Sequence, residues 1–279
     1  MVSGADVLVT LLTEKIDSEV LSAAGTQLKA VCNVAVGYNN IDLAECSRRG
    51  IKVTNTPGVL TEATADIAMA LILMVTRRLA EGERVIRGQN SWQWGMHYML
   101  GAGIQQRRLG IIGMGAIGAA TARRARAFGM TIAYTNRSTA DVALERELEM
   151  ERMSLDDLLA TSDVVSVHCP SNESTFHLIG APQFAEMKTT AFLINTARGP
   201  IVDENALVAA LESGEIAGAG LDVFEHEPAV HSGLVHRDDV VLLPHLGSAT
   251  LETRSAMATL AATNAVAVVT GKDPLTPVN

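Results

Sequence analysis

Three ionisable residues, Arg198, Glu227 and His245, each stand just after a short apolar segment with the composition of a buried strand. In open α/β sheets, ligands bind at the carboxyl ends of such strands. Arginine presents a rigid fork that suits a carboxylate, and histidine transfers protons near neutral pH. Each residue also has an ordinary interpretation, as a surface charge, a solvated turn residue and a hydrogen-bonded strand-end histidine respectively. Their occurrence at successive strand ends favours a functional site.

A glycine-rich segment predicts a second kind of chemistry. It follows a predicted strand at 108–112, opens a predicted helix at 117–128, and consists of Gly113, Met114, Gly115, Ala116, Ile117 and Gly118. The first glycine permits a tight turn, the second lets the backbone approach a pyrophosphate, and the third allows close helix–strand packing, while the helix N-terminus attracts phosphate. The segment predicts a dinucleotide site, and a merely tight turn is the alternative.

The residues after the next predicted strand, 131–135, indicate which dinucleotide would bind. An NAD site usually has an acidic residue there for the ribose hydroxyls. This chain has Asn136, Arg137 and Ser138 instead, and its first acid is Asp141. Arg137 can pair with a 2′-phosphate, and its two neighbours can donate hydrogen bonds to it. We therefore expect NADP(H) to be favoured over NAD(H), with an ordinary exposed arginine as the alternative.

The elements that must position these residues alternate along the chain. Helices are predicted at 40–49, 61–79, 117–128, 154–159, 205–212 and 251–270, and strands at 6–12, 29–35, 51–54, 108–112, 131–135, 164–168, 191–195, 219–223 and 240–243. The alternation predicts an α/β fold with a parallel sheet and helices on both faces. Residues 81–106 interrupt it and resemble a linker, and the acidic run 141–151 is interpreted as a solvated helix face.

Length and charge limit the function further. The 279 residues suggest about two domains, and 22 Lys and Arg against 31 Asp and Glu give a formal net charge of −9. Such a field disfavours nucleic acid and anionic membranes as main partners, and the longest apolar run, 67–75, is too short for a membrane span. Three cysteines and the lack of a signal-peptide pattern indicate a cytoplasmic protein. No residue is assigned to a metal.

Motifs spread through the chain resemble the D-isomer-specific 2-hydroxyacid dehydrogenase family, most closely its glyoxylate and hydroxypyruvate reductase branch. They occur in the family's order: VGYNNID (36–42), NTPGVLTEATAD (55–66), LGIIGMGAIG (109–118), NTARG (195–199), GLDVFE (220–225) and PHLGSAT (244–250). The resemblance implies two Rossmann- or flavodoxin-like parallel-sheet domains, a substrate domain at 1–78 plus 253–279 and an NAD(P)-binding domain at 79–252. It also implies NAD(P)H-dependent reduction of glyoxylate or hydroxypyruvate to the 2-hydroxy acid by a homodimer.

The resemblance assigns roles residue by residue. Arg198 would hold the substrate's carboxylate and keto group, His245 would protonate the keto oxygen as hydride arrives from the nicotinamide, and Glu227 would orient that imidazole. The backbone at Val36 and Gly37 would bind the substrate carboxylate. Further cofactor contacts are implied at Thr64, Cys169, Pro170, Thr196, Ala197, Asp222, His245 and Gly247, and the side-chain pocket of the substrate at Trp94 and Met99.

The chain departs from the family's pattern at its N-terminus. Family members usually carry a further strand–helix–strand before the segment that matches Gly4–Leu12, so we expect an N-terminally truncated substrate domain. The alternative to an active enzyme is therefore a catalytically impaired or truncated dinucleotide-binding or sensing protein of the same fold.

Overall fold

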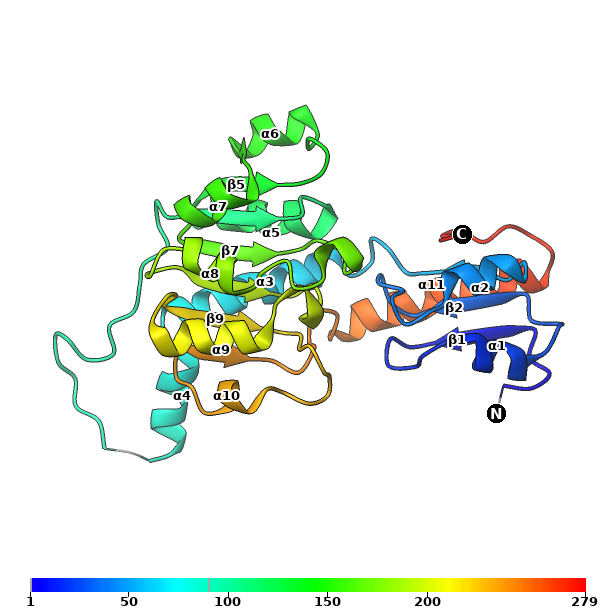
Figure 1. Cartoon of the computed structure of the whole chain (residues 1–279), viewed down its shortest axis with the longest axis horizontal. Helices are drawn as coiled ribbons and strands as arrows, with labels where there is room; N and C mark the ends of the chain where they lie inside the picture. Colours follow the sequence, from blue (N-terminus) through cyan, green and yellow to red (C-terminus); the bar gives the residue numbers. More distant parts are fainter. Residues whose placement is uncertain (1, 90) are drawn as a thin grey trace. The chain divides into compact units, whose positions relative to one another are not determined.

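The computed structural model describes residues 2–89 and 91–279. The chain divides into two compact units (Figure 1). Unit 1 comprises residues 1–61 and 248–279, and unit 2 comprises residues 62–247. The two ends of the chain thus belong to unit 1, and unit 2 is inserted between them.

Unit 1 is a small parallel sheet with helices packed on it. Its strands pair in the order β1-β2-β3. Its elements are β1 (Val7–Thr10), α1 (Ser18–Ala24), β2 (Ala30–Asn33), α2 (Leu43–Arg48), β3 (Lys52–Thr54) and α11 (Leu251–Val269). α1 and α2 begin at Asp17 and Asp42, whose carboxylates accept hydrogen bonds from first-turn amides. α11 packs on β1 and β2 (Figure 1).

Unit 2 contains a seven-stranded sheet in which every pair of neighbouring strands is parallel, as the alternation predicts. The strand order is β10-β9-β8-β7-β4-β5-β6. The strands are β4 (Arg108–Ile112), β5 (Thr131–Thr135), β6 (Glu151–Arg152), β7 (Val164–Val167), β8 (Phe192–Asn195), β9 (Gly218–Leu221) and β10 (Val240–Leu242). The winding direction reverses between β4 and β7, and a crevice at such a switch point is where doubly wound sheets bind ligands.

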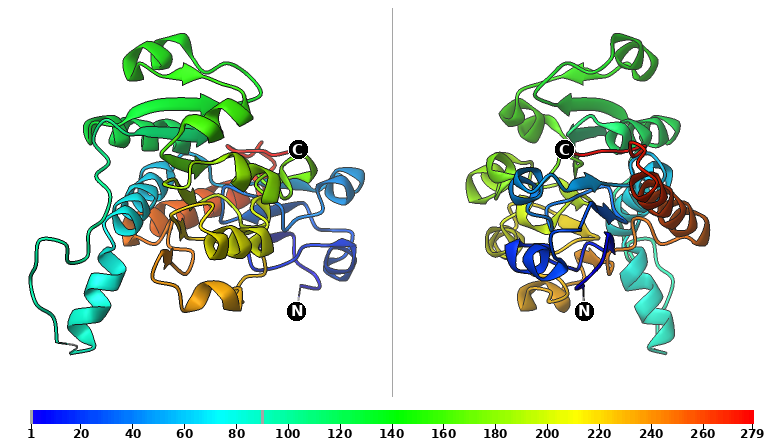
Figure 2. Two further views of the ribbon diagram at one scale, coloured as in Figure 1. Left: turned by 60° about the vertical axis from the view of Figure 1, so that its left-hand side comes forward. Right: turned by 90° about the vertical axis from the view of Figure 1, so that its right-hand side faces the viewer.

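Apolar side chains cover both faces of this sheet. Successive residues of a strand point to opposite faces, and Leu193 and Ile194 of β8 accordingly belong to different core clusters. The helices that surround the sheet are α3 (Thr61–Thr76), α4 (Leu79–Arg87), α5 (Ala116–Ala127), α6 (Val142–Leu148), α7 (Leu155–Thr161), α8 (Ala181–Glu186), α9 (Glu204–Ser213) and α10 (Ser232–Val235). After α4 the chain forms an extended segment away from the sheet (Figure 2), and it returns at Ala102, whose N–H donates to Thr76 O at 2.7 Å.

The boundary between the units differs from the predicted one. A single helix was expected over 61–79, but α3 ends at Thr76 and Arg78 takes a left-handed conformation with φ of 55° before α4 begins. Part of the predicted linker at 81–106 is therefore helical. α3 packs closely on β9, because a Cβ on Gly220 would lie 3.0 Å from Cβ of Leu71. This contact assigns α3 to unit 2, whereas the predicted boundary followed residue 78.

Candidate functional site

The glycine-rich turn lies at the switch point between β4 and β7. Gly113 has φ of 98°, and a Cβ there would lie 2.5 Å from the backbone nitrogen of Cys169, which follows β7. A Cβ on Gly118 would overlap the carbonyl oxygen of Gly113. Both glycines are therefore required by the fold of the turn itself. Met114 is buried beside them, whereas Ala116 is exposed and Ile117 half-buried at the start of α5.

Two observations show that this edge of the sheet can accommodate a dinucleotide. Within the described part of the chain, no atom lies within 4 Å of the Cβ that Gly115 would carry, so the N-terminus of α5 faces open space. Thr196, which follows β8, is only 7% exposed, and its Oγ1 has no hydrogen-bond partner among the described residues. A buried hydroxyl without a partner is costly, and a bound polar group at this position would satisfy it.

The loop after β5 carries the residues expected to choose between the two dinucleotides. Arg137 and Ser138 are exposed, and Asn136 is half-buried. The carboxylate of Asp141 caps α6 by accepting hydrogen bonds from Ala143 N and Leu144 N, at 2.7 and 3.4 Å. The first acid after β5 is therefore engaged in local structure rather than presented to a ribose.

The turn after β7 supplies Cys169 and Pro170, of which Pro170 is exposed. Burial raises the pKa of the Cys169 thiol to about 11. The neighbouring His168 hydrogen-bonds through Nε2 to Ser166 Oγ at 2.8 Å, and burial lowers its pKa to about 4. Both groups are consequently neutral at physiological pH, which agrees with a structural turn and argues against a redox thiol.

The structure brings Glu227 and His245 together. Nδ1 of His245 donates a hydrogen bond to Oε2 of Glu227 at 2.9 Å, and the other carboxylate oxygen accepts one from Phe224 N at 3.0 Å. Burial by itself would raise the pKa of Glu227, but these two hydrogen bonds and the charges of His245 and Arg198 hold it below its usual value. Glu227 is therefore ionised at neutral pH and fixes which ring nitrogen faces it. Nε2 is the nitrogen left to exchange a proton elsewhere.

The backbone at His245 is held in an unusual conformation by Asp222. His245 has φ of 53°, and its N–H donates to the carbonyl oxygen of Asp222 at 2.9 Å. The Asp222 carboxylate accepts hydrogen bonds from Leu246 N at 2.6 Å and Gly247 N at 2.8 Å. Burial raises the pKa of Asp222, although both amides oppose that rise. Thr64 of α3 completes the arrangement by donating to Gly247 O at 3.1 Å.

Arg198 lies at the same edge of the sheet, after β8. Its backbone is fixed by Asn195, the last residue of β8, whose side chain donates to Arg198 O at 2.9 Å and accepts from Ala197 N at 3.0 Å. Burial lowers the pKa of Arg198 and the Glu227 carboxylate opposes that change, so the two charges influence each other. The three residues singled out from the sequence thus follow the adjacent strands β8, β9 and β10.

The other predicted substrate residues lie elsewhere in the chain. Val36 and Gly37 belong to unit 1, after β2, and their carbonyl oxygens accept hydrogen bonds from the side chains of Asn55 and Asn33 at 2.8 and 2.9 Å. These contacts fix the orientation of that loop.

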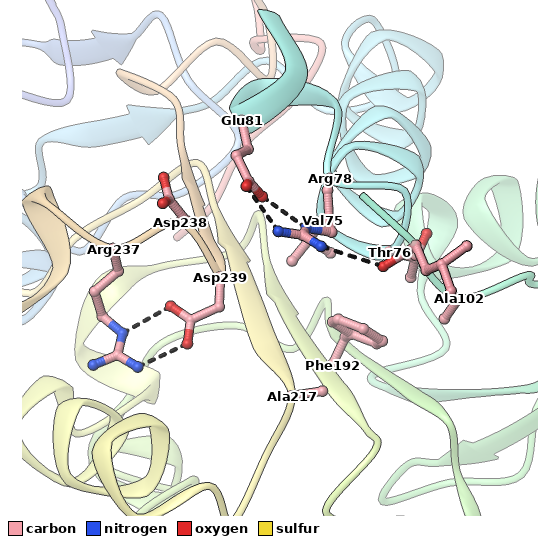
Figure 3. A pocket seen from close by; sticks show the side chains of 12 residues that line it. Val75, Thr76, Arg78, Glu81, Ala102, Phe192, Ala217, Arg237, Asp238 and Asp239 are labelled. Carbon is pink, nitrogen blue, oxygen red and sulfur yellow. Dashed lines mark hydrogen bonds and ion pairs between the residues drawn. The ribbon is translucent and has the colours of Figure 1, made fainter. Parts of the chain in front are cut away.

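Trp94 and Met99 are not brought near Arg198, Glu227 and His245 within one chain. Both lie on the segment after α4, and Trp94 is 75% exposed. The end of this segment borders a cavity of about 610 Å³ beside Phe192, Ala217 and Asp239, which stand where β8, β9 and β10 begin (Figure 3). The catalytic candidates follow the opposite ends of these strands. The charged groups of the cavity pair with each other, as in Arg78–Glu81 and Arg237–Asp239 (Figure 3).

Sequence reasoning missed residues that hold the site in place. Asn195 belongs to a quoted motif but was given no role, although a polar residue at the end of a buried strand was a usable signal. Arg152 was also missed: it donates to Asn136 O at 3.0 Å and Arg137 O at 3.2 Å, and so fixes the loop after β5. The short strand β6, which carries Arg152, has no sequence pattern that distinguishes it from the acidic run before it.

Among the helices of residues 2–89 and 91–279, none combines the length and the apolar character that a membrane span requires. No group of three or more His, Cys, Asp or Glu side chains in this part of the chain is arranged to hold a metal ion.

Comparison with known proteins agrees with this geometry. The family model for the D-isomer specific 2-hydroxyacid dehydrogenase, NAD binding domain, matches residues 69–247. A glyoxylate reductase of Korarchaeum cryptofilum is 50% identical over 281 residues, an alignment that covers 100% of this chain and 84% of that protein. A glyoxylate reductase of Pyrococcus horikoshii is 48% identical over 283 residues, with the same coverage. The chain belongs to the D-isomer specific 2-hydroxyacid dehydrogenase family.

Solved structures extend the comparison to the fold. A glyoxylate reductase from Paecilomyes thermophila is similar with a TM-score of 0.91 and 39% identity, covering 98% of this chain and 83% of that one. An NADPH-dependent glyoxylate/hydroxypyruvate reductase from Sinorhizobium meliloti, in complex with NADP and malonate, has a TM-score of 0.89 and 36% identity, with the same coverage. The chain is accordingly an NAD(P)-dependent 2-hydroxyacid dehydrogenase.

The raised pKa of Cys169 leads to a testable prediction. The thiolate is the reactive form, and each pKa unit above the ordinary value lowers its fraction tenfold at a fixed pH. With a pKa of about 11, we expect iodoacetamide to alkylate Cys169 in the folded protein at pH 7.5 about 100-fold more slowly than in the urea-denatured chain. Peptide mass spectrometry over time measures both rates. Equal rates would contradict the burial argument.

Proposed function

We propose that this protein reduces glyoxylate, and hydroxypyruvate as a related substrate, to the 2-hydroxy acid with NADPH as the preferred reductant and His245 as the proton donor. The observation that carries the proposal is the 2.9 Å hydrogen bond between His245 and Glu227, formed where Arg198 reaches the same edge of the sheet. The relatives named glyoxylate reductase support the substrate. The complete set of three residues does not favour the alternative of a catalytically impaired sensing protein.

Arg198 is the group proposed to bind the acid. A guanidinium can hold a carboxylate and an adjacent keto oxygen through its fixed fork of N–H groups. Its partial burial strengthens this interaction, because charges attract more strongly away from water. We further propose that the backbone of Val36 and Gly37 makes a second contact with the substrate carboxylate.

His245 is the group proposed to move the proton. With Nδ1 bound to Glu227, Nε2 donates its proton to the keto oxygen, and the carboxylate of Glu227 stabilises the ring while it is positively charged. When bound, the reduced nicotinamide supplies the hydride that the carbonyl carbon accepts. Arg198 and His245 together stabilise the negative charge that develops on the oxygen, so full alkoxide charge never builds up.

The residues proposed to hold the cofactor line the carboxyl edge of the sheet. The N-terminus of α5, with Gly113 to Gly118, suits the pyrophosphate. Thr196 offers its unpartnered hydroxyl, and Cys169 and Pro170 form the turn beside the Gly113 loop. The remaining proposed contacts are Thr64, Ala197, Asp222, His245 and Gly247.

The preference for NADPH rests on the loop after β5. Asn136, Arg137 and Ser138 can surround a 2′-phosphate, and Arg152 fixes the carbonyl oxygens behind them. Asp141 is engaged as the cap of α6 and so is not offered to the ribose.

A cytoplasmic location is also proposed, since the chain's cysteines, Cys32, Cys46 and Cys169, are free thiols.

The proton-donor role predicts the effect of one substitution. Glutamine at position 245 can still hydrogen-bond to Glu227 but cannot donate an acidic proton, so we expect H245Q to lower kcat for glyoxylate by about 100-fold or more. Steady-state kinetics at pH 7 measure this, and NADPH binding by fluorescence confirms an intact cofactor site. The control is H236Q, at an exposed histidine of the same unit. Wild-type turnover in H245Q would refute the role.

The cofactor preference predicts a second effect. Reversing the charge at Arg137 removes a charge-assisted hydrogen bond to the 2′-phosphate and adds repulsion, so R137D should lower the ratio of kcat/KM for NADPH to that for NADH by about 10- to 100-fold. The matched control is R146D, an exposed arginine on α6. A wild-type ratio that already favours NADH would overturn the proposed preference.

We also propose a homodimer: Trp94 lies on the exposed segment after α4, whose end borders the cavity at the opposite ends of the strands from the catalytic candidates, and a second copy would bring Trp94 and Met99 to the substrate. We expect sedimentation equilibrium to give twice the 29.5 kDa chain mass. We also expect W94A to raise KM for glyoxylate. Mixed dimers of W94A and H245Q should combine the KM for glyoxylate that W94A alone loses with the turnover that H245Q alone lacks, since one site in each mixed dimer then contains both intact residues. A monomeric, fully active enzyme would exclude this arrangement.

A further inference from the structure

A cluster of ionisable side chains lies next to the proposed site without belonging to it. His177 Nε2 lies 2.7 Å from Oε1 of Glu225, and its Nδ1 lies 3.8 Å from Asp203 Oδ2. The Glu225 side chain is 12% exposed and that of His177 32% exposed. The proposed mechanism uses none of these residues.

A second buried glutamate, Glu204, adds another carboxylate to this cluster. Glu225 N donates to Glu204 Oε1 at 2.8 Å, and Glu204 N donates to Glu225 Oε2 at 3.4 Å, so the two residues are linked reciprocally. Glu204 is 5% exposed, at the start of α9. Carboxylates held together away from water repel each other unless hydrogen bonds or positive charge offset the repulsion. The helix N-terminus supplies part of that compensation, and His177 is the basic side chain in contact with Glu225.

The backbone connects this cluster to the two ends of the proposed site. Gly199, the neighbour of Arg198, lies so close to Phe224 that a Cβ would overlap the Phe224 carbonyl. His177 N donates to Pro200 O at 2.9 Å, next along the same turn. His177 therefore contacts both turns. Its backbone N–H binds the turn after Arg198, and its ring binds Glu225 in the turn before Glu227.

His177 also has a strained backbone. Its φ is 49°, a left-handed conformation that non-glycine residues rarely adopt. The ring stacks on Phe176 with centroids 3.9 Å apart and planes inclined by 17°. Such conformations persist only where the surroundings over-determine them, and they concentrate at functional sites.

We propose that His177 and Glu225 are positioning residues for the reduction. Their contact holds the turn that carries Arg198 against the turn that carries Glu227, and so sets the separation between the substrate-binding guanidinium and the carboxylate that orients His245. Neither residue is among those proposed above to contact the substrate or the cofactor. This inference rests on the roles proposed above for Arg198, Glu227 and His245.

The test compares H177A, H177Q and E225Q in the full-length enzyme. A misplacement of catalytic groups by about 1 Å can lower the rate by about 100-fold. We expect H177A to lower kcat/KM for glyoxylate by about 10- to 100-fold, where the number of active sites is counted by titration with NADPH. The Kd for NADPH should stay within about twofold of the wild-type value. H177Q keeps a donor that reaches Glu225 and should recover most of the loss. E225Q, which keeps the shape and removes a charge, should fall between the two.

The controls separate this inference from a general loss of structure. H236A tests an exposed histidine of the same unit and should leave kcat/KM unchanged. Wild-type kcat/KM in H177A would overturn the inference, and so would equal losses of glyoxylate efficiency and NADPH affinity in H177A and H177Q. If H177A does not fold, E225Q decides: unchanged kcat/KM per NADPH site overturns the inference, and a selective loss supports it. Failure of the proposed function is distinct, because H245Q would then retain turnover whatever the His177 variants do.

Discussion

The parallel pairing of all seven strands in unit 2 is the constraint from which the site follows. Each strand must be followed by a crossover before the chain can return, so every loop that leaves a strand begins at the same edge of the sheet. Arg198, Glu227 and His245 follow the adjacent strands β8, β9 and β10, and the Gly113 and Cys169 turns follow the adjacent strands β4 and β7. Residues far apart in sequence are thus placed along a single edge, with the residues proposed to bind the cofactor on both sides of the switch point.

Within this edge, burial and hydrogen bonds oppose each other at each carboxylate. Burial raises the pKa of Glu227, but the hydrogen bonds from His245 and the Phe224 amide, with the charges of His245 and Arg198, outweigh burial and hold that pKa below its usual value. For Asp222, burial outweighs the hydrogen bonds that its carboxylate accepts from two backbone amides, and the pKa of Asp222 is raised. The Glu227 carboxylate faces the proposed proton donor, whereas the Asp222 carboxylate binds the backbone that follows His245, whose conformation is left-handed. Carboxylates thus have a proposed chemical role in one turn and a structural role in the other.

Much of the site could be predicted because its signals are local. A Cβ at Gly113 or Gly118 would overlap neighbouring backbone atoms, so both positions need glycine. The segments that precede Arg198, Glu227 and His245 are short apolar runs, which is the pattern of a buried strand. The unit to which α3 belongs differs from the predicted one because an apolar helix suits the core of either unit, and its close contact with Gly220 joins it to unit 2. The helix predicted over 61–79 was also too long, since no adjacent glycine or proline in the sequence marks the left-handed conformation of Arg78.

The sequence by itself determined most of the alternation of strands and helices, although not, for example, α1, α8 or β6. It also determined the glycine-rich turn and the three ionisable residues at strand ends, because each depends on neighbours only a few positions away. The tertiary structure alone decided which of these residues meet. It joined Glu227 to His245, left Trp94 on an exposed segment after α4, and assembled His177, Glu204 and Glu225 next to the turn that follows Arg198. Such contacts join residues tens of positions apart, and their existence depends on how the sheet pairs, which no local pattern encodes.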